Sequence, residues 1–229
     1  MRLAQLERDG FQIVPELFCR TEIQGIIELL ESEAESLRGS ARGGTRDVLD
    51  RLPLLRELAQ NAAILNIVRG ALGEGAFVAR ATLFDKTPEA NWKVPWHQDV
   101  TIAVQEKREV AGYGPWSTKA GVVHVQPPTE VLERMLTVRV HLDECAATNG
   151  ALRVMPGSHR LGRLDQNAVG GFVDEGSAVC CSANAGDALV MRPLLLHASS
   201  AAVYPQHRRV LHFDYAVGEL AGGLEWKMR

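Results

Sequence analysis

Length, composition and charge narrow the classes of protein that this chain can represent. The chain has 229 residues, which is enough to bury a full hydrophobic core, and we expect a single domain over residues 1–229. Its net charge is −3, and its charged residues are spread without a basic stripe for nucleic acid or a polybasic arm for a membrane surface. These properties favour a protein that acts on a small molecule, as a monomer or homodimer.

The start of the chain and its cysteines predict the compartment. Charged residues interrupt the first nine positions from Arg2 onward, and the sequence has no apolar run of about 18 residues, so we expect a cytoplasmic protein without a membrane span. No cysteine pair has Cys-x-x-Cys spacing, and two adjacent cysteines would point to opposite faces of a strand. We therefore expect small buried residues, and neither a zinc site nor a disulfide framework, from Cys19, Cys145, Cys180 and Cys181.

A first helix is predicted over residues 21–38. Apolar residues recur there at helical spacing after a capping-box pattern, Thr21-x-x-Gln24, and Gly39 follows as a stop signal. We expect residues 39–46 to form a flexible basic loop.

A second helical region is predicted over residues 54–72, with a break near Asn61. Neither helical segment is apolar all round, so both must pack against another apolar surface. We expect residues 1–75 to form a mainly helical layer on a β core built from residues 76–229.

From Ala76 onward, short β-like runs alternate with Gly, Pro and Asn, without helices between them. This pattern favours an antiparallel sandwich or barrel over βαβ units, and we expect a jelly roll (a double-stranded β-helix, cupin-like) with helices on one sheet. The expected strands are residues 77–85, 120–126, 135–143, 151–155, 178–181, 187–192, 194–199 and 208–217. Two long irregular segments, residues 100–118 and 159–176, are expected to act as lids or substrate loops.

Three His-x-Asp tripeptides occur in the chain, where its composition predicts about 0.3 by chance. Residues i and i+2 of a strand project from one face, so each tripeptide could present an imidazole and a carboxylate to one metal ion. A second histidine would complete the 2-His-1-carboxylate triad that is typical of non-haem Fe(II) oxygenases. The three pairs are His97/Asp99, His141/Asp143 and His212/Asp214.

Downstream residues distinguish the three pairs. His97 and Asp99 are followed by a distant His197, and by two arginines at 208–209 that could hold an anionic co-substrate. The last pair lies near the end of the chain, with no histidine after it. We therefore predict that His97, Asp99 and His197 bind a metal, and that the histidines of the other two pairs line the barrel.

Motifs along nearly the whole chain resemble one known family. They are Asp9-Gly10-Phe11 with Val14-Pro15, Asp85-Lys86-Thr87-Pro88, Trp96-His97-Gln98-Asp99, the stretch from Asn149-Gly150 to Pro156-Gly157-Ser158-His159-Arg160, His197-x-Ser199, and Arg208. The Asn-Gly to Pro-Gly-Ser-His stretch is the most specific of these. The chain resembles the phytanoyl-CoA dioxygenase family, a branch of the Fe(II)- and 2-oxoglutarate-dependent oxygenases with a double-stranded β-helix fold.

The resemblance implies roles for particular residues. The implied Fe(II) ligands are His97, Asp99 and His197, and the implied 2-oxoglutarate residues are Arg208, Ser199 and Thr137. An arginine suits the far carboxylate of 2-oxoglutarate because its planar fork binds carboxylates bidentately. Strand parity separately predicts that Ser199 shares the face of His197 and that Arg209 lies on the face opposite Arg208.

The resemblance also implies a reaction. Together with O2, 2-oxoglutarate would be decarboxylated to succinate and CO2 while a C–H bond of a small metabolite is hydroxylated. Two alternatives stay open: a cupin-like metal protein that needs no co-substrate, and a non-catalytic binding module. Arg208 and Ser199 weigh against the first, and the presence of every implied ligand and anchor weighs against the second.

The substrate pocket is predicted from alternation over residues 137–143, where polar residues alternate with Val138, Val140 and Leu142. If the polar face looks inward, Arg139 and His141 line the cavity and Arg139 holds an anionic substrate; the alternative is a face that looks at solvent. The basic and aromatic residues expected around the mouth of the cavity are Lys86, Lys93, Lys119, Trp92 and Trp116.

Overall fold

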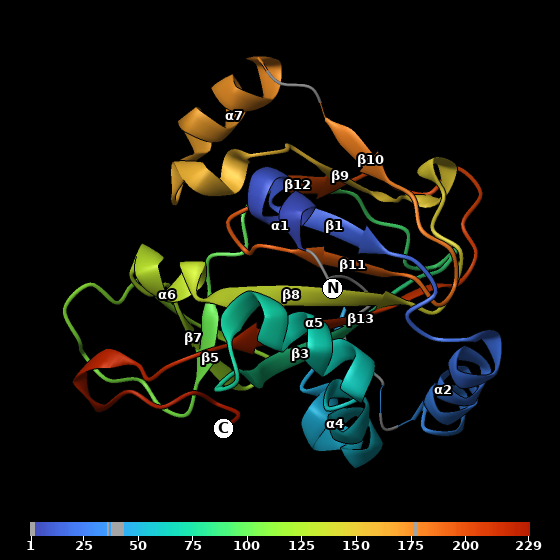
Figure 1. Cartoon of the computed structure of the whole chain (residues 1–229), viewed down its shortest axis with the longest axis horizontal. Helices are drawn as coiled ribbons and strands as arrows, with labels where there is room; N and C mark the ends of the chain where they lie inside the picture. The colour runs from blue at the N-terminus through green and yellow to red at the C-terminus, as the bar shows by residue number, and fades with distance from the viewer. Residues whose placement is uncertain (1–2, 36, 38–43, 176–177) are drawn as a thin grey trace.

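The computed structural model describes residues 3–35, 37, 44–175 and 178–229, whose strands form three antiparallel sheets (Figure 1). The largest sheet has six strands in the order β1 (Phe11–Val14), β11 (Ala188–Met191), β8 (Met135–His141), β13 (Arg208–Ala216), β3 (Phe77–Lys86) and β2 (Thr45–Arg46). β1 and β2 come from the region expected to be mainly helical. Each forms an edge of this sheet.

The other two sheets are smaller. One has the order β10 (Val179–Cys181), β9 (Leu152–Val154), β12 (His197–Ser199) and β4 (Val94–His97), and the other the order β5 (Ile102–Val104), β7 (Val122–Val125) and β6 (Trp116–Lys119). No strand pairing among the described residues joins the six-stranded and four-stranded sheets, so they form a sandwich and not a closed barrel. The predicted jelly-roll class is confirmed.

Helices cover one face of the six-stranded sheet (Figure 1). The helices are α1 (Ala4–Asp9), α2 (Arg20–Ser32), α3 (Val48–Arg51), α4 (Pro53–Ala59), α5 (Ala62–Leu72), α6 (Thr129–Glu133) and α7 (Gln166–Glu175), with 3-10 turns at Ala147–Asn149, Ser158–Leu161 and Ala221–Gly223. The apolar side chains of α1 to α5 pack against Val138, Leu211 and Phe213 of the outer sheet face, and this is the main core. α6 packs in a separate apolar cluster with Met135, and α7 contacts β4. None of the described helices is long and apolar enough to cross a membrane.

The inner face of the six-stranded sheet is divided into two parts. Around β1 and β11, apolar side chains such as Phe11 and Leu189 pack against Leu152 of the four-stranded sheet. Towards β8, β13 and β3, the inward side chains are mostly polar although they are largely buried. These residues are Arg80, Thr82, Lys86, Thr137, Arg139, His141, Arg208, His212 and Asp214.

The first predicted helix is shorter than expected, and its cap is different. α2 ends at Ser32, and the N-cap is Cys19, whose backbone N–H donates to Oε2 of Glu22 at 2.7 Å. The Thr21-x-x-Gln24 pattern is therefore wrong as a capping box, because the helix begins two residues earlier than a Thr21 cap requires. Residues 39–43 of the expected loop lie outside the described residues, and Thr45–Arg46 form β2.

The second helical region breaks where predicted. α4 ends at Ala59 and α5 starts at Ala62, with the side chain of Asn61 accepting the N–H of Ala63 at 2.8 Å. Such a cap satisfies one of the free backbone donors at a helix start. An asparagine in the middle of an apolar pattern therefore marks a new helix here.

Other differences concern segments without clear periodicity. Residues 100–118 contain β5 and the start of β6, and residues 159–176 contain α7, so neither is wholly irregular. Only the last part of the expected strand 194–199 pairs, as β12.

The cysteine prediction is half right. Cys145 and Cys181 are buried, but Cys19 and Cys180 are exposed. Local structure explains the two exposed cysteines. Cys19 is the N-cap of α2, and Cys180 projects from the face of β10 opposite to that of its buried neighbour Cys181.

Candidate metal centre

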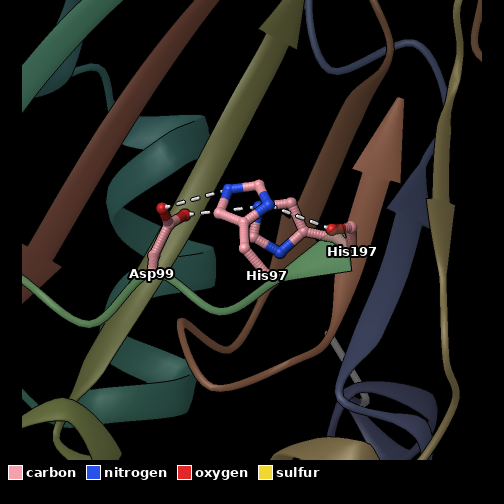
Figure 2. A group of neighbouring side chains, drawn as sticks. All are labelled: His97, Asp99 and His197. Atoms are coloured by element: carbon pink, nitrogen blue, oxygen red, sulfur yellow. Dashed lines mark hydrogen bonds and ion pairs between the residues drawn. The ribbon is translucent and has the colours of Figure 1, made fainter. Parts of the chain in front are cut away.

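His97, Asp99 and His197 come together where β4 ends beside β12 (Figure 2). The two histidines face each other in the strand register, and their ring centroids lie 4.2 Å apart. Oδ1 of Asp99 is 3.9 Å from Nε2 of His97, and Oδ2 is 3.6 Å from Nε2 of His197. One ligand atom from each residue lies within 4.8 Å of the others, and no other such group of histidine, cysteine or acidic residues occurs in the described parts of the chain.

Backbone carbonyls orient both imidazole rings. Nδ1 of His197 is 2.8 Å from the carbonyl oxygen of Leu195, and Nδ1 of His97 is 2.9 Å from that of Pro95. Because a carbonyl can only accept, each Nδ1 carries the proton and each Nε2 lone pair is directed towards Asp99. Burial lowers the pKa of His197 to about 4, so this ring is neutral at pH 7, as a metal ligand must be.

The three residues fit a first-row metal ion. Two atoms that each lie about 2.1 Å from one ion are at most about 4.2 Å apart, and the two measured separations of 3.6 and 3.9 Å meet this limit. Oδ2 of Asp99 is buried without a hydrogen-bond partner, so a bound cation would satisfy it. Two imidazoles and one carboxylate leave half of an octahedral shell for other ligands, which suits non-haem Fe(II).

The pair His141/Asp143 is divided between two faces of the sheet. His141 ends β8 on the inner face, where neither ring nitrogen has a partner. Asp143 accepts two 2.9 Å hydrogen bonds from Arg209, whose Nη1 also pairs with Glu31 at 2.9 Å. Arg209 therefore lies on the outer face while Arg208 is buried on the inner face, as strand parity predicts.

The pair His212/Asp214 is a buried hydrogen-bonded unit. Nε2 of His212 is 2.9 Å from Oδ1 of Asp214, and its Nδ1 accepts from Nη1 of Arg139 at 2.7 Å. Asp214 also accepts from the Thr137 hydroxyl at 2.7 Å and from Arg80. Burial alone would raise the pKa of Asp214, but Arg80 and His212 lower it well below its usual range. These residues line the interior, and the Thr137 hydroxyl is engaged by Asp214.

Three buried cations, Arg208, Lys86 and Arg139, form a cluster that we call the Arg208 group. Lys86 is paired with Arg208 in the strand register, and Arg139 lies on the next strand along the same inner face. The three residues are 3%, 1% and 6% exposed, and none forms an ion pair with a described carboxylate. Burial, followed by repulsion from Arg208, lowers the pKa of Lys86 to about 8 and that of Arg139 to about 10.

Backbone carbonyls and Ser199 hold the Arg208 group in place. Nη1 of Arg208 donates to the carbonyl of Gly150 at 2.5 Å, and Nζ of Lys86 donates to Oγ of Ser199 at 3.2 Å and to the carbonyl of Ser200 at 2.7 Å. Gly150 has a φ of +68°, and a Cβ there would lie 2.7 Å from the Ser200 carbonyl. Only glycine fits this position, which explains the Asn-Gly motif in physical terms.

Unpartnered atoms surround the Arg208 group. They are Nε of Arg208, Nε of Arg139 and both ring nitrogens of His141, all of them buried. Buried polar atoms nearly always have a partner, and buried cations are normally paired with an anion. A dicarboxylate would supply hydrogen-bond acceptors for the unpartnered atoms and negative charge for the cations, so these residues fit 2-oxoglutarate.

The polar side chains of β8, which ends at His141, face inward, as one of the two alternatives predicted. Thr137, Arg139 and His141 are 0%, 6% and 2% exposed, so the alternative of a solvent-facing polar side is wrong. They lie between β11 and β13, and the helical layer covers only the other face of the strand.

The residues predicted to form a basic and aromatic rim lie in several different places. Lys86 is buried because it projects from the inner face of β3, so its prediction as a rim residue is wrong. Trp92 and Lys93 line a separate surface hollow, built from residues 88–93, that contains no metal ligand. Trp116 packs against the apolar cluster between the three-stranded sheet and the C-terminal segment. Trp92 nevertheless lies near the Arg208 group, since Nζ of Lys86 is 5.7 Å from the centroid of the Trp92 ring.

A cleft of about 930 Å³ borders the metal centre at His97. Its walls include Trp96 and Gln98 from the metal-binding segment, Gly114 and Pro115 from one long connection, and residues 163–165 from the other. Both segments that were expected to act as substrate loops therefore contribute to this cleft.

Gln98 is a residue whose role the sequence analysis missed. Its side chain is 7% exposed; Nε2 donates to the carbonyls of Gly162 at 2.8 Å and Leu194 at 2.7 Å, and Oε1 accepts the N–H of Leu164 at 2.8 Å. The amide thus ties the segment that leads to α7 to the chain that leads to β12. The sequence did contain a signal for this role. Gln98 lies between His97 and Asp99, and the middle residue of an extended segment faces away from the side of its two neighbours.

The jelly roll and the arrangement of His97, Asp99 and His197 define a class, the jelly-roll proteins with a 2-His-1-carboxylate metal site. Within this class, the chain belongs to the phytanoyl-CoA dioxygenase family, whose model matches residues 6–210. No curated protein sequence matches the chain.

Solved structures confirm the fold. The chain is similar to apo EctD from S. alaskensis, with a TM-score of 0.72 and 19% identity over 95% of this chain and 77% of that one. It is also similar to the epimerase SnoN from nogalamycin biosynthesis (TM-score 0.70, 19% identity, 94% and 81% covered). HygX from Streptomyces hygroscopicus, solved with nickel and 2-oxoglutarate bound, gives a TM-score of 0.69 and 15% identity, with 95% and 87% covered.

Proposed function

We propose that this protein is an Fe(II)- and 2-oxoglutarate-dependent dioxygenase that uses O2 to hydroxylate a C–H bond of a small metabolite, with release of succinate and CO2. The observation that carries the proposal is a metal-binding triad beside the Arg208 group, with buried unpartnered atoms in both. The family supports it. So do solved relatives that hold iron, nickel or 2-oxoglutarate.

The chain's own residues hold and orient the reactants in this proposal. His97, Asp99 and His197 hold Fe(II), which supplies the O2-dependent oxidation coupled to decarboxylation of 2-oxoglutarate. The carbonyls of Pro95 and Leu195 fix the two imidazoles so that each Nε2 faces the ion. These contacts orient the two rings independently of the ion.

The Arg208 group receives the co-substrate. Arg208 and Lys86 hold the far carboxylate of 2-oxoglutarate beside the Ser199 hydroxyl. Arg139, predicted from the sequence as a substrate anchor, lies with these two cations, and we assign it to the same co-substrate site. Its bond to His212 links that site to Asp214 and Thr137, so Thr137 contributes through Asp214.

An anaerobic titration tests the proposal. Fe(II) and 2-oxoglutarate added together should produce a weak visible charge-transfer band. In the Arg208→Ala variant, a much higher 2-oxoglutarate concentration should be needed to produce this band. Absence of the band in the wild-type protein with stoichiometric iron would favour a cupin-like metal protein that needs no co-substrate. Iron content measured on the same sample separates that outcome from loss of the metal.

The outcome of the reaction needs its own measurement. Solved relatives of this fold include an alpha ketoglutarate dependent epimerase and a carbocyclase, so the fold does not restrict the product. A screen of metabolites for stimulated succinate release identifies the substrate. The product mass then tests hydroxylation, which adds one oxygen atom, whereas desaturation or ring closure removes two hydrogens.

A further inference from the structure

A second cationic cluster, which we call the Arg46 group, lies on the same inner face. Arg46 of β2 is paired with Thr82 of β3, and Arg80 is two residues from Thr82, so both project inward. Lys119 of β6 meets them from the three-stranded sheet: its Nζ is 3.4 Å from Oγ1 of Thr101, and Nη1 of Arg80 is 3.4 Å from the Thr101 carbonyl. Arg46, Arg80 and Lys119 make up the group.

The Arg46 group and the Arg208 group lie on either side of Asp99. Arg80 pairs with Asp214, which lies six residues beyond Arg208 on β13, or roughly 20 Å at about 3.4 Å per residue. Thr101, the contact of Arg80 and Lys119, is two residues after Asp99. The Asp99 carboxylate is near enough to favour the charged forms of both Arg80 and Lys119.

Two of these cations form no ion pair with a described residue, although the Asp47 carboxylate lies near Arg46 and the Asp99 carboxylate lies near Lys119. Arg80 is paired with Asp214, but neither Arg46 nor Lys119 forms an ion pair with a carboxylate in the described parts of the chain. Both are half-buried, and burial followed by repulsion from Arg80 lowers the pKa of each. Like charges that are partly removed from water are unfavourable unless an anion binds between them.

His124 adds a second, independent unpartnered group. It is 1% exposed and shares a face of the three-stranded sheet with Lys119, because Lys119 is paired with Val122, two residues before His124. Nδ1 of His124 is 3.0 Å from the Val122 carbonyl, and its Nε2 is buried without a partner. A buried polar atom without a partner is typical of a place where a ligand binds.

We infer that Arg46 and Lys119 bind an anionic group, a carboxylate or a phosphate, of the small-molecule substrate. The inference rests on the proposed function, since it takes 2-oxoglutarate to occupy the Arg208 group on the other side of Asp99. One anion is then held on each side of the metal centre, and the substrate bond to be oxidised lies between them. Guanidinium and ammonium groups are the usual partners of carboxylates and phosphates.

Binding of two probe anions tests the site. Inorganic phosphate and acetate are titrated by calorimetry into the anaerobic protein loaded with Fe(II) and saturating 2-oxoglutarate, at constant ionic strength. The wild-type protein should bind at least one of them. Arg46→Gln and Lys119→Gln should each weaken that binding at least about tenfold, because each removes a charge-assisted hydrogen bond.

Control variants separate charge from folding. Lys119→Arg keeps the positive charge, so it should bind the anion within about threefold of the wild-type affinity. If Lys119 had only a structural role, Lys119→Arg and Lys119→Gln should weaken anion binding equally. Lys107→Gln removes an exposed lysine that pairs with Glu109 and should change nothing. Circular dichroism and melting temperature report whether each variant is folded.

The outcomes separate this inference from the proposed function. Loss of anion binding in both glutamine variants, with an unchanged 2-oxoglutarate charge-transfer band, supports the inference. Equal binding in the wild-type protein and both variants, or no binding of either anion by the wild-type protein, overturns it. Absence of the band in the wild-type protein overturns the proposed function instead, and the anion titration still decides whether Arg46 and Lys119 bind anions.

A matched set of metabolites tests the substrate class. Carboxylic acids and phosphate esters are compared with their neutral amides or alcohols for stimulated succinate release. The anionic members should stimulate release at least about tenfold better, and Lys119→Gln should reduce this preference by raising KM with little change in kcat. Equal stimulation by neutral counterparts in the wild-type enzyme overturns the assignment.

Discussion

The Arg208 group and the Arg46 group both place cations on the inner sheet face, but they are supported in different ways. Arg208, Lys86 and Arg139 project from the central strands β13, β3 and β8, and are almost fully buried. The Gly150 and Ser200 carbonyls hold Arg208 and Lys86 in place. A site with such fixed donors suits one ligand of constant shape, such as 2-oxoglutarate.

The Arg46 group is built at the margin of the fold. Arg46 lies on a two-residue edge strand, and Lys119 ends a strand of the smallest sheet. Both are half-buried, and Lys119 has only a 3.4 Å contact to Thr101. The comparison teaches that burial and support differ between the two groups, as expected if a constant co-substrate binds at the rigid centre and a variable substrate binds at short peripheral elements.

Removing Asp99, which lies between the two groups, should have the largest effect. Asp99→Ala should lower metal affinity and turnover by more than about 100-fold. Even mutation of residues that only hydrogen-bond to a metal ligand lowers metal affinity or activity by about 10- to 100-fold. The melting temperature should change little, since the Asp99 side chain is one-quarter exposed. Metal content and succinate release measure both effects, with the exposed Glu106→Ala as control; wild-type turnover with full iron content would rule out the triad.

Arg208→Ala tests the role of the Arg208 group in binding 2-oxoglutarate. Truncating one partner of a buried charge pair costs about 2–5 kcal/mol, so the 2-oxoglutarate Kd should rise by at least roughly 30-fold. Arg209→Ala removes the neighbouring charge on the outer face, where Asp143 and Glu31 are its partners, and should change this Kd by less than about threefold. The charge-transfer titration measures both variants. Equal effects would mean that the inward face of β13 is wrongly assigned.

The titration of Lys86 sharpens the comparison further. Its pKa of about 8 means that the amine is charged below pH 8 and loses its charge above it, so 2-oxoglutarate binding should weaken as pH rises. Between pH 8 and 9 the Kd should increase by up to about tenfold. Lys86→Met should show weaker binding at pH 7 and a nearly flat profile. Calorimetry with Ni(II) in place of iron measures the series, and a flat wild-type profile would exclude this role.

Gln98 should affect neither cationic group and should give the smallest change. Gln98→Ala frees the carbonyls of Gly162 and Leu194 and the N–H of Leu164, so hydrogen exchange over residues 162–164 should become faster. The substrate KM should rise about 3- to 10-fold with unchanged 2-oxoglutarate affinity. Gln105→Ala, at an exposed glutamine, is the control. A parallel loss of 2-oxoglutarate binding would show that the Gln98 hydrogen bonds support the metal centre itself.

The parts of the fold that could be predicted from the sequence depend on local patterns. The long strands β3, β8 and β13 have clear alternation, and the break at Asn61 has a local capping signal. Short strands such as β2 and β5 lack enough residues for a period to be visible, and pairing with a distant partner forms them. Sequence patterns therefore predicted the centre of the sandwich better than its edges.

The candidate site follows the same division. His97, Asp99 and His197 could be predicted because spacing and motif mark them, and Arg208 because it follows at a motif distance. Lys86 was misplaced because its neighbours in space, Ser199 and Arg208, are more than 100 residues away in the chain. Lys119 was expected at a rim, but its partner Arg46 had no local signal. They come together because the three-stranded sheet packs beside the six-stranded sheet, where Lys119 and Arg80 both contact Thr101.

The two-residue strand β2 has a consequence for protein engineering. It adds only Thr45 and Arg46 to the sheet, and it attaches to β3 alone. Replacing Arg46 with a neutral or acidic residue would change the charge beside Arg80 without altering any side chain of the main core. If Arg46 binds the substrate anion, directed evolution towards neutral or cationic compounds can therefore start at a single peripheral codon.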